Sequence, residues 1–479
     1  KFVCFVLTCQ LFILTTWAKP DWPSDTGIMA EAGIVMDMDS GAILYGQNIH
    51  LTYPPASITK ILTALIVLEN CNLDDTVTFS TTAVNQVEAD SGNKISVVAG
   101  DQLSVEDCLY SMLLVSCNQA ANALAEHTAG SISAFVNMMN EKLAQLGCQE
   151  SHFENPSGLN GDNQYVSAYD MALIAQAAYD NETLVEISSA TTHKIAPTTQ
   201  NPDGFTIRGE HRLCVTEDPS SPYYYPEAVA GKTGYLIKAG NTLVTYAVKD
   251  NRRLISVILK GQPRQYFVDG KALLEFGFRS FQDYTVADYE SRYVTGNETI
   301  NLDKGSFQAS DLMIDPDSVI TLPNSASFED ADITLGALPE ISPDNAVALL
   351  TYSYNDRTIG TAYLLAKDGV TIDGNDSAAE AATTAFDTAN AEAPLATASN
   401  AEKPQRPHKH ISVAGVLITI LIVLLVLGVI GLISWFIYSK KKEAKALAKR
   451  RERRRQRLQR SGDEEEFERL LAEYKNKKK

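Results

Sequence analysis

A long apolar run near the C-terminal end limits how this chain can be arranged: from Ile411 to Tyr438 it contains no charged residue. At about 1.5 Å per residue, a helix over this run is longer than the ~30 Å hydrocarbon core of a bilayer. A dense run of Lys and Arg follows from Lys440 onward, and such residues are enriched on the cytoplasmic side of a span. The pattern predicts one transmembrane helix over 411–438, a basic cytoplasmic tail over 439–479, and the bulk of the chain outside the cell.

The opposite end of the sequence predicts export. One Lys precedes an apolar stretch from Phe2 to Leu14, and small and polar residues follow as far as Ala18. This is the pattern of a secretory signal peptide, so we expect residues 1–18 to be removed. The cysteines left after removal are odd in number and lack CxxC spacing, which predicts at least one free thiol and neither a zinc site nor a full disulfide framework. They are Cys71, Cys108, Cys117, Cys148 and Cys214.

Charge separates the predicted tail from the rest of the chain. The whole chain has a net charge of −18, whereas the part from Lys440 to Lys479 holds 17 Lys and Arg against 8 Asp and Glu. The remainder is therefore strongly acidic, which argues against nucleic-acid binding by the outer part. Beside a membrane span, the basic tail is best explained as a topology signal in contact with anionic lipid.

Hydrophobic periodicity predicts an α+β domain with an antiparallel sheet over residues 26–282. A hairpin with a D-S-G turn spans 32–46, a helical block with two breaks spans 104–147, and a further helix is expected over 168–180. Two strands joined by a K-D-N-R-R turn and a final helix close the domain. This order of strands, helical block and strands again is the basis of the fold-class prediction.

The chain that follows has a different pattern. Short alternating runs broken by Gly, Pro, Asn and Asp predict a small all-β domain over 283–368. Residues 369–410 are rich in Ala, Asp, Thr, Ser and Pro and hold few large apolar residues. This composition is typical of a disordered linker, here between the outer domains and the membrane.

Three short motifs carry the candidate chemistry. Each is weak alone, because such patterns arise by chance in a long chain, but their co-occurrence in this order is specific. A serine hydroxyl needs a base to take its proton, and helix positions three apart share a face, so Lys60 can serve Ser57. The motifs are Ser57-Ile-Thr-Lys60, Ser116-Cys117-Asn118 and Lys232-Thr233-Gly234.

The two motif lysines have opposite requirements. An ordinary lysine, with a pKa of about 10.4, is no base at neutral pH, so we expect apolar burial and the nearby Lys232 to keep Lys60 neutral. Lys232 itself must stay charged to hold a substrate carboxylate, with help from the Thr233 hydroxyl. Gly231 and Gly234 lack side chains, which predicts room for a substrate backbone along this strand.

With these motifs the chain resembles the serine D-alanyl-D-alanine carboxypeptidases, the low-molecular-mass penicillin-binding proteins of bacterial cell-wall metabolism. Other matching stretches are DMDSGAILY, NPSGLNGDNQYVSAYDMALIA and AGKTGYLIKAGNTLV, so the resemblance covers most of residues 28–281. It implies the penicillin-binding/β-lactamase-like transpeptidase fold without cofactor or metal. It also implies removal of the terminal D-alanine from peptidoglycan stem pentapeptides through an acyl-serine, with β-lactams as inhibitors.

The resemblance assigns roles to single residues. Ser57 is the expected nucleophile, Lys60 its base and Ser116 the proton relay to the leaving group. The backbone N–H groups of Ser57 and Tyr235 are the expected oxyanion hole. Cys117 departs from the Ala, Gly or Asp usual in the family and places a thiol beside the site. The expected substrate-binding residues are Asn118, Lys232, Thr233, Gly234 and Tyr235.

Each motif residue also has a simpler explanation. Ser57 fits a helix N-cap, and Lys60 fits a lysine that reaches solvent from a core helix. Ser116 and Asn118 fit capping residues between two helices. Lys232 fits a charge that protects an edge strand.

Two other functions share these features. A β-lactamase carries the same motifs, and Glu154 is the candidate for its deacylating carboxylate, although the surrounding N-P-S-G-L pattern is closer to the carboxypeptidases. A non-catalytic membrane receptor for muropeptides or β-lactams would account for the long tail. We expect the carboxypeptidase, held in the bacterial cell membrane by one span with its catalytic domain outside; its oligomeric state stays open.

Overall fold

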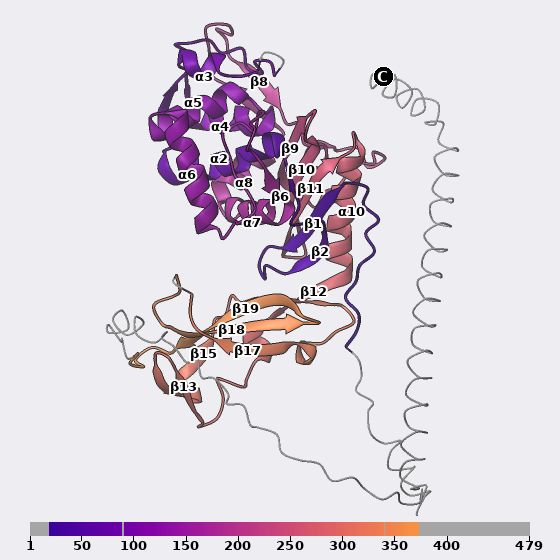
Figure 1. Ribbon diagram of the computed structural model, residues 1–479, viewed down its shortest axis with the longest axis vertical. Helices are drawn as coiled ribbons and strands as arrows, with labels where there is room; N and C mark the ends of the chain where they lie inside the picture. Colours follow the sequence, from indigo (N-terminus) through magenta and orange to yellow (C-terminus); the bar gives the residue numbers. More distant parts are fainter. Residues whose placement is uncertain (1–18, 89–90, 340, 373–479) are drawn as a thin grey trace, which may run out of the picture. The chain divides into compact units, whose positions relative to one another are not determined.

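The computed structural model describes residues 19–88, 91–339 and 341–372 (Figure 1). The chain divides into the units Lys1–Thr383 and Thr384–Lys479, and all described residues belong to the first. The predicted signal peptide, span and tail, and nearly all of the predicted linker, lie outside the described residues. Within the described part, no helix is both long enough and apolar enough to cross a bilayer.

A five-stranded antiparallel sheet, in the order β2-β1-β11-β10-β9, forms the centre of the first region. Successive strand residues point to opposite faces: Ile34 and Met36 pack in the core shared with most helices, whereas Val35 packs in the core beside α10 (Gln265–Ser280). Both faces of the sheet are therefore buried. The strands are β1 (Ala32–Asp37), β2 (Ile43–Gln47), β9 (Ala228–Leu236), β10 (Gly240–Lys249) and β11 (Arg252–Gly261).

Both predicted hairpins are confirmed. β1 and β2 join through the D-S-G turn, where Asp37 Oδ1 accepts hydrogen bonds from the backbone N–H groups of Asp39 and Ser40. β10 and β11 join through Asp250 and Asn251, whose φ values are 50° and 64°. Two consecutive positive φ angles are typical of the type I′ turn that matches the twist of a hairpin.

The helical block lies beside the sheet and surrounds α2 (Lys60–Asn70), whose residues 60–67 are all buried (Figure 1). A helix that is buried on all sides belongs in the centre of a core. Ser104, Ser131 and Ser167 accept the N-cap hydrogen bonds of three helices. The predicted breaks and the predicted helix over 168–180 are confirmed. The helices are α4 (Val105–Leu114), α5 (Asn118–Ala129), α6 (Ile132–Gln145), α7 (Ala168–Tyr179) and α8 (Glu182–Ser189).

Short elements that the sequence did not predict complete this region. They are α3 (Thr81–Asn85), α9 (Arg212–Val215), and the paired strands β3 (Thr52–Tyr53) with β6 (Val166–Ser167), β4 (Thr76–Thr78) with β5 (Gln102–Ser104), and β7 (Thr192–Ile195) with β8 (Phe205–Arg208).

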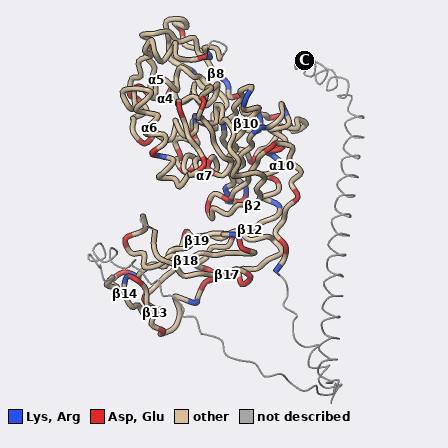
Figure 2. Tube along the Cα trace, viewed as in Figure 1, with Lys and Arg blue, Asp and Glu red and all other residues tan. Residues whose placement is uncertain are grey.

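From Phe281 onward the described chain is mostly strand and has a hydrophobic core of its own, which includes Leu350 and Tyr352. Figure 2 shows Asp and Glu positions along both these strands and the preceding helices. The main sheet here has the order β15-β19-β18-β17. The elements are β12 (Phe281–Thr285), α11 (Val286–Tyr289), β13 (Thr299–Leu302), β14 (Gly305–Gln308), β15 (Leu312–Ile314), β16 (Val319–Pro323), β17 (Asp332–Gly336), β18 (Ala346–Tyr354) and β19 (Arg357–Ala366).

Candidate active site

Ser57 lies on a short 3₁₀ turn, η1 (Ala56–Thr59), which runs directly into α2. We expected Ser57 and Lys60 on one regular helix; instead the tighter turn places residues three apart almost in line. Neither Pro55 nor Thr59, the cap residues of η1 and α2, makes a side-chain cap hydrogen bond. The interpretation of Ser57 as a simple N-cap is therefore wrong.

Lys60 is completely buried, so the interpretation of a lysine that reaches solvent is also wrong. Its Nζ lies 3.0 Å from Ser57 Oγ and donates to Asn118 Oδ1 at 2.8 Å. It also donates to the backbone carbonyl of Ser157 in a short contact. A neutral amine has two N–H groups and one lone pair. Two carbonyl-type acceptors take the N–H groups, which leaves the lone pair for the hydroxyl of Ser57.

The surroundings of Lys60 favour this neutral form. Burial is the largest cause that holds the pKa of Lys60 well below its usual range, and the positive charge of Lys232 lowers this pKa further. Both causes disfavour an ammonium ion, because a charged group loses solvation on burial and is repelled by a second cation. The predicted tuning of Lys60 is thus confirmed in direction and in cause.

The Ser116-Cys117-Asn118 motif forms the entry to α5. Ser116 has a φ of 62°, a left-handed conformation that is costly for a residue other than glycine. Asn118 is the first residue of α5, and Cys117 is its N-cap without a side-chain cap hydrogen bond. The expectation that Ser116 and Asn118 cap the helix is wrong: the amide of Asn118 instead holds Lys60.

The thiol of Cys117 is an unreactive neighbour of this site. Cys117 has no exposed surface, and burial raises its pKa to about 11, although backbone hydrogen bonds and the charges of Lys60 and Lys94 lower this pKa. Thiolates, not thiols, react with oxidants and electrophiles, so this environment disfavours redox chemistry at Cys117. All five cysteines of the described part are free thiols, which confirms the prediction of at least one.

Strand β9, at the edge of the sheet, carries the third motif. An ideal Cβ on Gly234 would lie 2.8 Å from Ser57 N and 2.4 Å from Thr242 Oγ1, so only glycine lets β9 approach the nucleophile turn this closely. A Cβ on Gly231 would instead lie 2.6 Å from the buried His211 Nε2. The predicted role of Gly231 is therefore corrected, since its missing side chain makes room for His211 and not for a substrate.

Lys232 is only 2% exposed, so it is not a solvated edge-strand charge. Its Nζ donates to Thr233 O at 2.9 Å. Burial is the main cause that lowers the pKa of Lys232 to about 8, while Glu210 raises this pKa and Lys94 lowers it. Lys232 is thus mainly a cation at pH 7, as predicted, but it loses its charge in the mildly alkaline range.

One cleft of about 710 Å³ brings the motifs together. Lys60 contacts its floor through Ser57 and Asn118, and Lys232 is buried next to Thr233. The sequence motifs assigned no role to the carbonyl of Ser157, or to Lys94 and Glu210 on the wall of the cleft. For Ser157, the surrounding N-P-S-G stretch was an available signal. The predicted residues that line the cleft are Ser57, Ser116, Asn118, Thr233, Gly234 and Tyr235.

Glu154, the candidate base of a β-lactamase, does not line this cleft. It borders a neighbouring hollow, where its Oε2 accepts a hydrogen bond from Asn163 N at 3.2 Å. The acidic residues on the wall of the cleft are Glu88 and Glu210, and both have partners: Asn160 donates to Glu88, and Lys94 pairs with Glu210. Glu154 therefore lies in the wrong place to direct water at Ser57.

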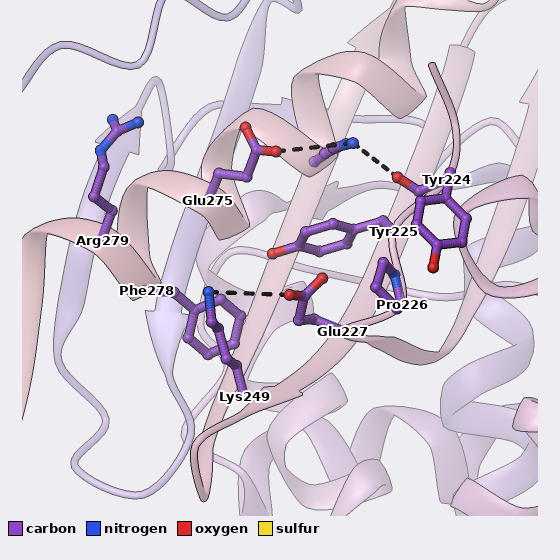
Figure 3. Close-up of a pocket in the computed structure, with 9 residues that line it drawn as sticks. Tyr224, Tyr225, Pro226, Glu227, Lys249, Glu275, Phe278 and Arg279 are labelled. Carbon is purple, nitrogen blue, oxygen red and sulfur yellow. Dashed lines mark hydrogen bonds and ion pairs between the residues drawn. The ribbon is translucent and has the colours of Figure 1, made fainter. Parts of the chain in front are cut away.

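A second hollow, of about 580 Å³, lies between the segment before β9 and α10 (Figure 3). It contains none of the motif residues. Four of its charged groups form loose pairs, Lys249 with Glu227 at 3.9 Å and Lys271 with Glu275 at 3.8 Å, whereas Arg279 lies apart from them. Lys271 Nζ also donates to Tyr224 O at 2.8 Å. Its polar groups are therefore largely satisfied within the chain.

A serine on a turn beside a buried lysine amine, next to an antiparallel sheet flanked by a helical block, defines a serine hydrolase of the penicillin-binding type. The family model described as D-alanyl-D-alanine carboxypeptidase matches residues 19–262. The chain belongs to this family of serine peptidases.

Two relatives agree with the family match. The D-alanyl-D-alanine carboxypeptidase DacB2 of Mycobacterium tuberculosis is 34% identical over 265 residues, which cover 54% of this chain and 84% of the relative. The D-alanyl-D-alanine carboxypeptidase DacA of Haemophilus influenzae is 31% identical over 354 residues, which cover 70% of this chain and 84% of the relative. The solved structure of a D-alanyl-D-alanine carboxypeptidase from Mycobacterium tuberculosis is 31% identical with a TM-score of 0.47, covering 55% of this chain and 93% of the other.

Proposed function

We propose that this chain removes the terminal D-alanine from peptidoglycan stem pentapeptides through an ester formed on Ser57. The observation that carries the proposal is the fully buried amine of Lys60 at 3.0 Å from Ser57 Oγ. Membership of the carboxypeptidase family supplies the expected substrate. The geometry supplies a means to activate the serine without histidine or metal.

Ser57 Oγ attacks the carbonyl carbon of the penultimate residue while its proton passes to Lys60 Nζ. The backbone N–H groups of Ser57 and Tyr235 stabilise the oxyanion. The tetrahedral intermediate collapses, the C–N bond breaks, and the proton held by Lys60 passes through Ser116 to the amine of the departing D-alanine, which returns Lys60 to its neutral form. Water then hydrolyses the ester, with Lys60 again as base.

The terminal carboxylate of the substrate binds beside β9. Lys232, charged at neutral pH, and the Thr233 hydroxyl attract it, and Asn118 holds the substrate backbone. A β-lactam presents a carboxylate and an acyl group in a similar arrangement, so it acylates the same serine. Both acidic residues on the described wall of the cleft have partners, which supports slow hydrolysis of the penicilloyl ester and argues against a β-lactamase.

We further propose the cellular setting from the sequence. Export by residues 1–18, a span over 411–438 and a cytoplasmic tail place the catalytic domain outside the bacterial cell membrane, where cell-wall synthesis and cell shape are determined. The separate core after Phe281 supports a small all-β domain over 283–368. The apolar run and its basic flank support the anchor.

Release of D-alanine from a synthetic pentapeptide tests the proposal. The wild-type protein should release D-alanine, and Ser57→Ala should reduce the rate by at least about 10³-fold, as is typical when a nucleophile is removed. Mass spectrometry of the penicillin-treated protein should find the adduct on Ser57.

The other outcomes separate the alternative functions. An adduct on a different residue would overturn the mechanism. Penicillin binding without any Ser57-dependent release of D-alanine would favour the non-catalytic receptor. Rapid turnover of nitrocefin would identify a β-lactamase.

A further inference from the structure

Strand β9 is held at Gly231, directly before the cation Lys232, by side chains from two other elements. Ser188 of α8 reaches its outer edge, and His211, the residue before α9, lies behind it. Both side chains are buried, and neither lines the cleft of Ser57. Any effect that they have on the chemistry must therefore pass through β9.

Ser188 occupies the free edge of the strand. β9 is the last strand of the sheet, so the backbone groups that turn away from β10 have no strand partner. At Gly231 the Ser188 hydroxyl bonds to both of them: it accepts from Gly231 N and donates to Gly231 O, each at 3.2 Å. In an antiparallel pair, alternate residues turn their N–H and C=O outward, so Thr233 and Tyr235 turn the same way. Ser188 thus fixes the edge of β9 two residues before the part that is expected to receive substrate.

His211 supports the same position from behind. Successive strand residues point to opposite faces of a sheet, so Gly231 and Lys232 belong to different faces. The imidazole of His211 lies on the Gly231 face, where an ideal Cβ would come within 2.6 Å of its Nε2. The ring also contacts Phe267 of α10, with 5.8 Å between the ring centroids. It therefore packs behind the strand, while the side chain of Lys232 lies on the other face.

The hydrogen bonds of His211 reach the strand partner of Lys232. Its Nε2 donates to Val244 O at 3.1 Å, and Val244 faces Lys232 across the two strands. Its Nδ1 lies 3.2 Å from Sγ of Cys214, whose thiol is free to donate. Burial and the charge of Lys232 lower the pKa of His211 to about 4, although backbone hydrogen bonds raise it. The ring is therefore neutral at pH 7 and uses its one N–H to bind β10.

The ammonium of Lys232 depends on this support. Its Nζ donates to Thr233 O at 2.9 Å, a partner on the same strand, so the charged group follows the backbone of β9. A lysine side chain is flexible and carries a compact charge. Its distance from a bound carboxylate is therefore set by what holds the strand around it.

We propose that Ser188 and His211 are positioning residues that hold Gly231 and thereby place the ammonium of Lys232 for the carboxylate of a substrate. The inference rests on the proposed function, in which Lys232 binds this carboxylate. Ser188 and His211 do not touch the substrate and take no part in the bond changes at Ser57.

Acylation by benzylpenicillin and by its methyl ester tests the inference. The two compounds share the β-lactam ring and the acyl group, but the ester has no free carboxylate. The wild-type protein should be acylated by the acid at a second-order rate at least about tenfold above that for the ester, equivalent to ~1.4 kcal/mol. A hydrogen bond between two charged groups is strong enough to give this preference.

The variants Ser188→Ala and His211→Ala should each reduce the preference to about threefold or less, because small shifts of a binding group are costly. His211→Gln keeps an N–H for Val244 O and should retain most of the preference. The ratio is the readout because a general loosening of the fold slows acylation by both compounds alike. Ser167→Ala is the control: it removes the N-cap hydrogen bond of α7 from another buried serine, outside β9, and should leave the ratio unchanged.

The outcomes separate the inference from the proposed function. Equal rates for the two compounds in the wild type, or a ratio that neither alanine variant changes, would overturn the inference. A ratio for His211→Gln as low as that for His211→Ala would contradict the part played by the bond to Val244. Release of D-alanine from a pentapeptide is measured separately. If the wild type releases none but its penicillin ratio falls in the variants, the proposed function is wrong and the placement of Lys232 stands.

Discussion

At the scale of single residues, two buried lysines in one site have different charges because their neighbours differ. Burial and, after it, the positive charge of Lys232 hold the pKa of Lys60 far below the usual range. Lys232 has the carboxylate of Glu210 within electrostatic reach, and its pKa of about 8 keeps it mainly charged at pH 7. Because their environments separate their pKa values, Lys60 can act as the base while Lys232 binds the carboxylate of the substrate.

The variant Asn118→Asp tests this division. It places a carboxylate 2.8 Å from Lys60 Nζ, and a close opposite charge raises the pKa of a lysine by about 1–3 units. The rate of penicillin acylation should rise with pH as Lys60 loses its proton and fall above pH 8 as Lys232 loses its charge. Asn118→Asp should move the rising limb to higher pH, whereas Asn118→Ala should leave it near its original pH. An unmoved limb in the aspartate variant would contradict the role of Lys60.

At the scale of elements, periodicity predicted the hairpins, the helical block and α10, because each has an apolar pattern and a turn signal of its own. The motifs predicted which residues meet. The sequence did not predict that Ser57 lies on a 3₁₀ turn, or that Ser157 offers its carbonyl to Lys60. Neither feature has a local pattern: both depend on contacts between segments distant in the chain, as does the place of His211 behind Gly231.

The variant Gly158→Ala tests whether the turn at Gly158 holds the turn that carries Ser57 in place. Gly158 has a φ of 81°, and an ideal Cβ there would lie 1.9 Å from Ala56 O, next to the nucleophile. The alanine should displace the turn that holds Ser57. Backbone strain alone should lower the free energy of unfolding by about 1–3 kcal/mol. The rate of acylation should fall at least about tenfold, because small shifts of reacting groups slow the reaction strongly.

Gly147→Ala is the matched control, because Gly147 has a similar φ of 74° but open space around its Cα. The left-handed conformation of an alanine at this position should lower the free energy of unfolding by about 1–2 kcal/mol, and the acylation rate should stay unchanged. Equal effects of both variants on acylation would mean that the contact with Ala56 does not position the nucleophile. Thermal unfolding and penicillin labelling measure the two effects.

At the scale of the whole described chain, the catalytic sheet and the strands after Phe281 share a polar network. Arg252 on β11 donates to Asp37 at 3.1 Å and to Asp283 on β12 at 2.9 Å. Thr321 on β16 donates to Asp283 at 2.9 Å and lies 2.7 Å from Ser40 Oγ. One guanidinium therefore compensates two carboxylates from different regions, and the D-S-G turn belongs to the same network.

The variant Arg252→Gln should destabilise the protein in a pH-dependent way. Burial, followed by the charge of Asp283, raises the pKa of Asp37 to about 7 from its usual value near 3.8. The folded state thus binds a proton that the unfolded state releases, so acid favours folding and ionisation above pH 7 opposes it.

Without Arg252, the ionised carboxylates of Asp37 and Asp283 have no cation beside them. At pH 8 the free energy of unfolding should therefore fall by about 3–5 kcal/mol, as it does when other buried ion pairs are broken. At pH 5.5 Asp37 is protonated and carries no charge, so the fall in the free energy of unfolding should be clearly smaller. Arg253→Gln is the control, because Arg253 is 35% exposed and pairs with Asp39 and Asp180 at the surface; it should cost less than about 1 kcal/mol at either pH. Urea unfolding at both pH values measures these differences in the free energy of unfolding. An equal fall for Arg252→Gln at pH 5.5 and at pH 8 would show that Asp37 does not control the stability of this network.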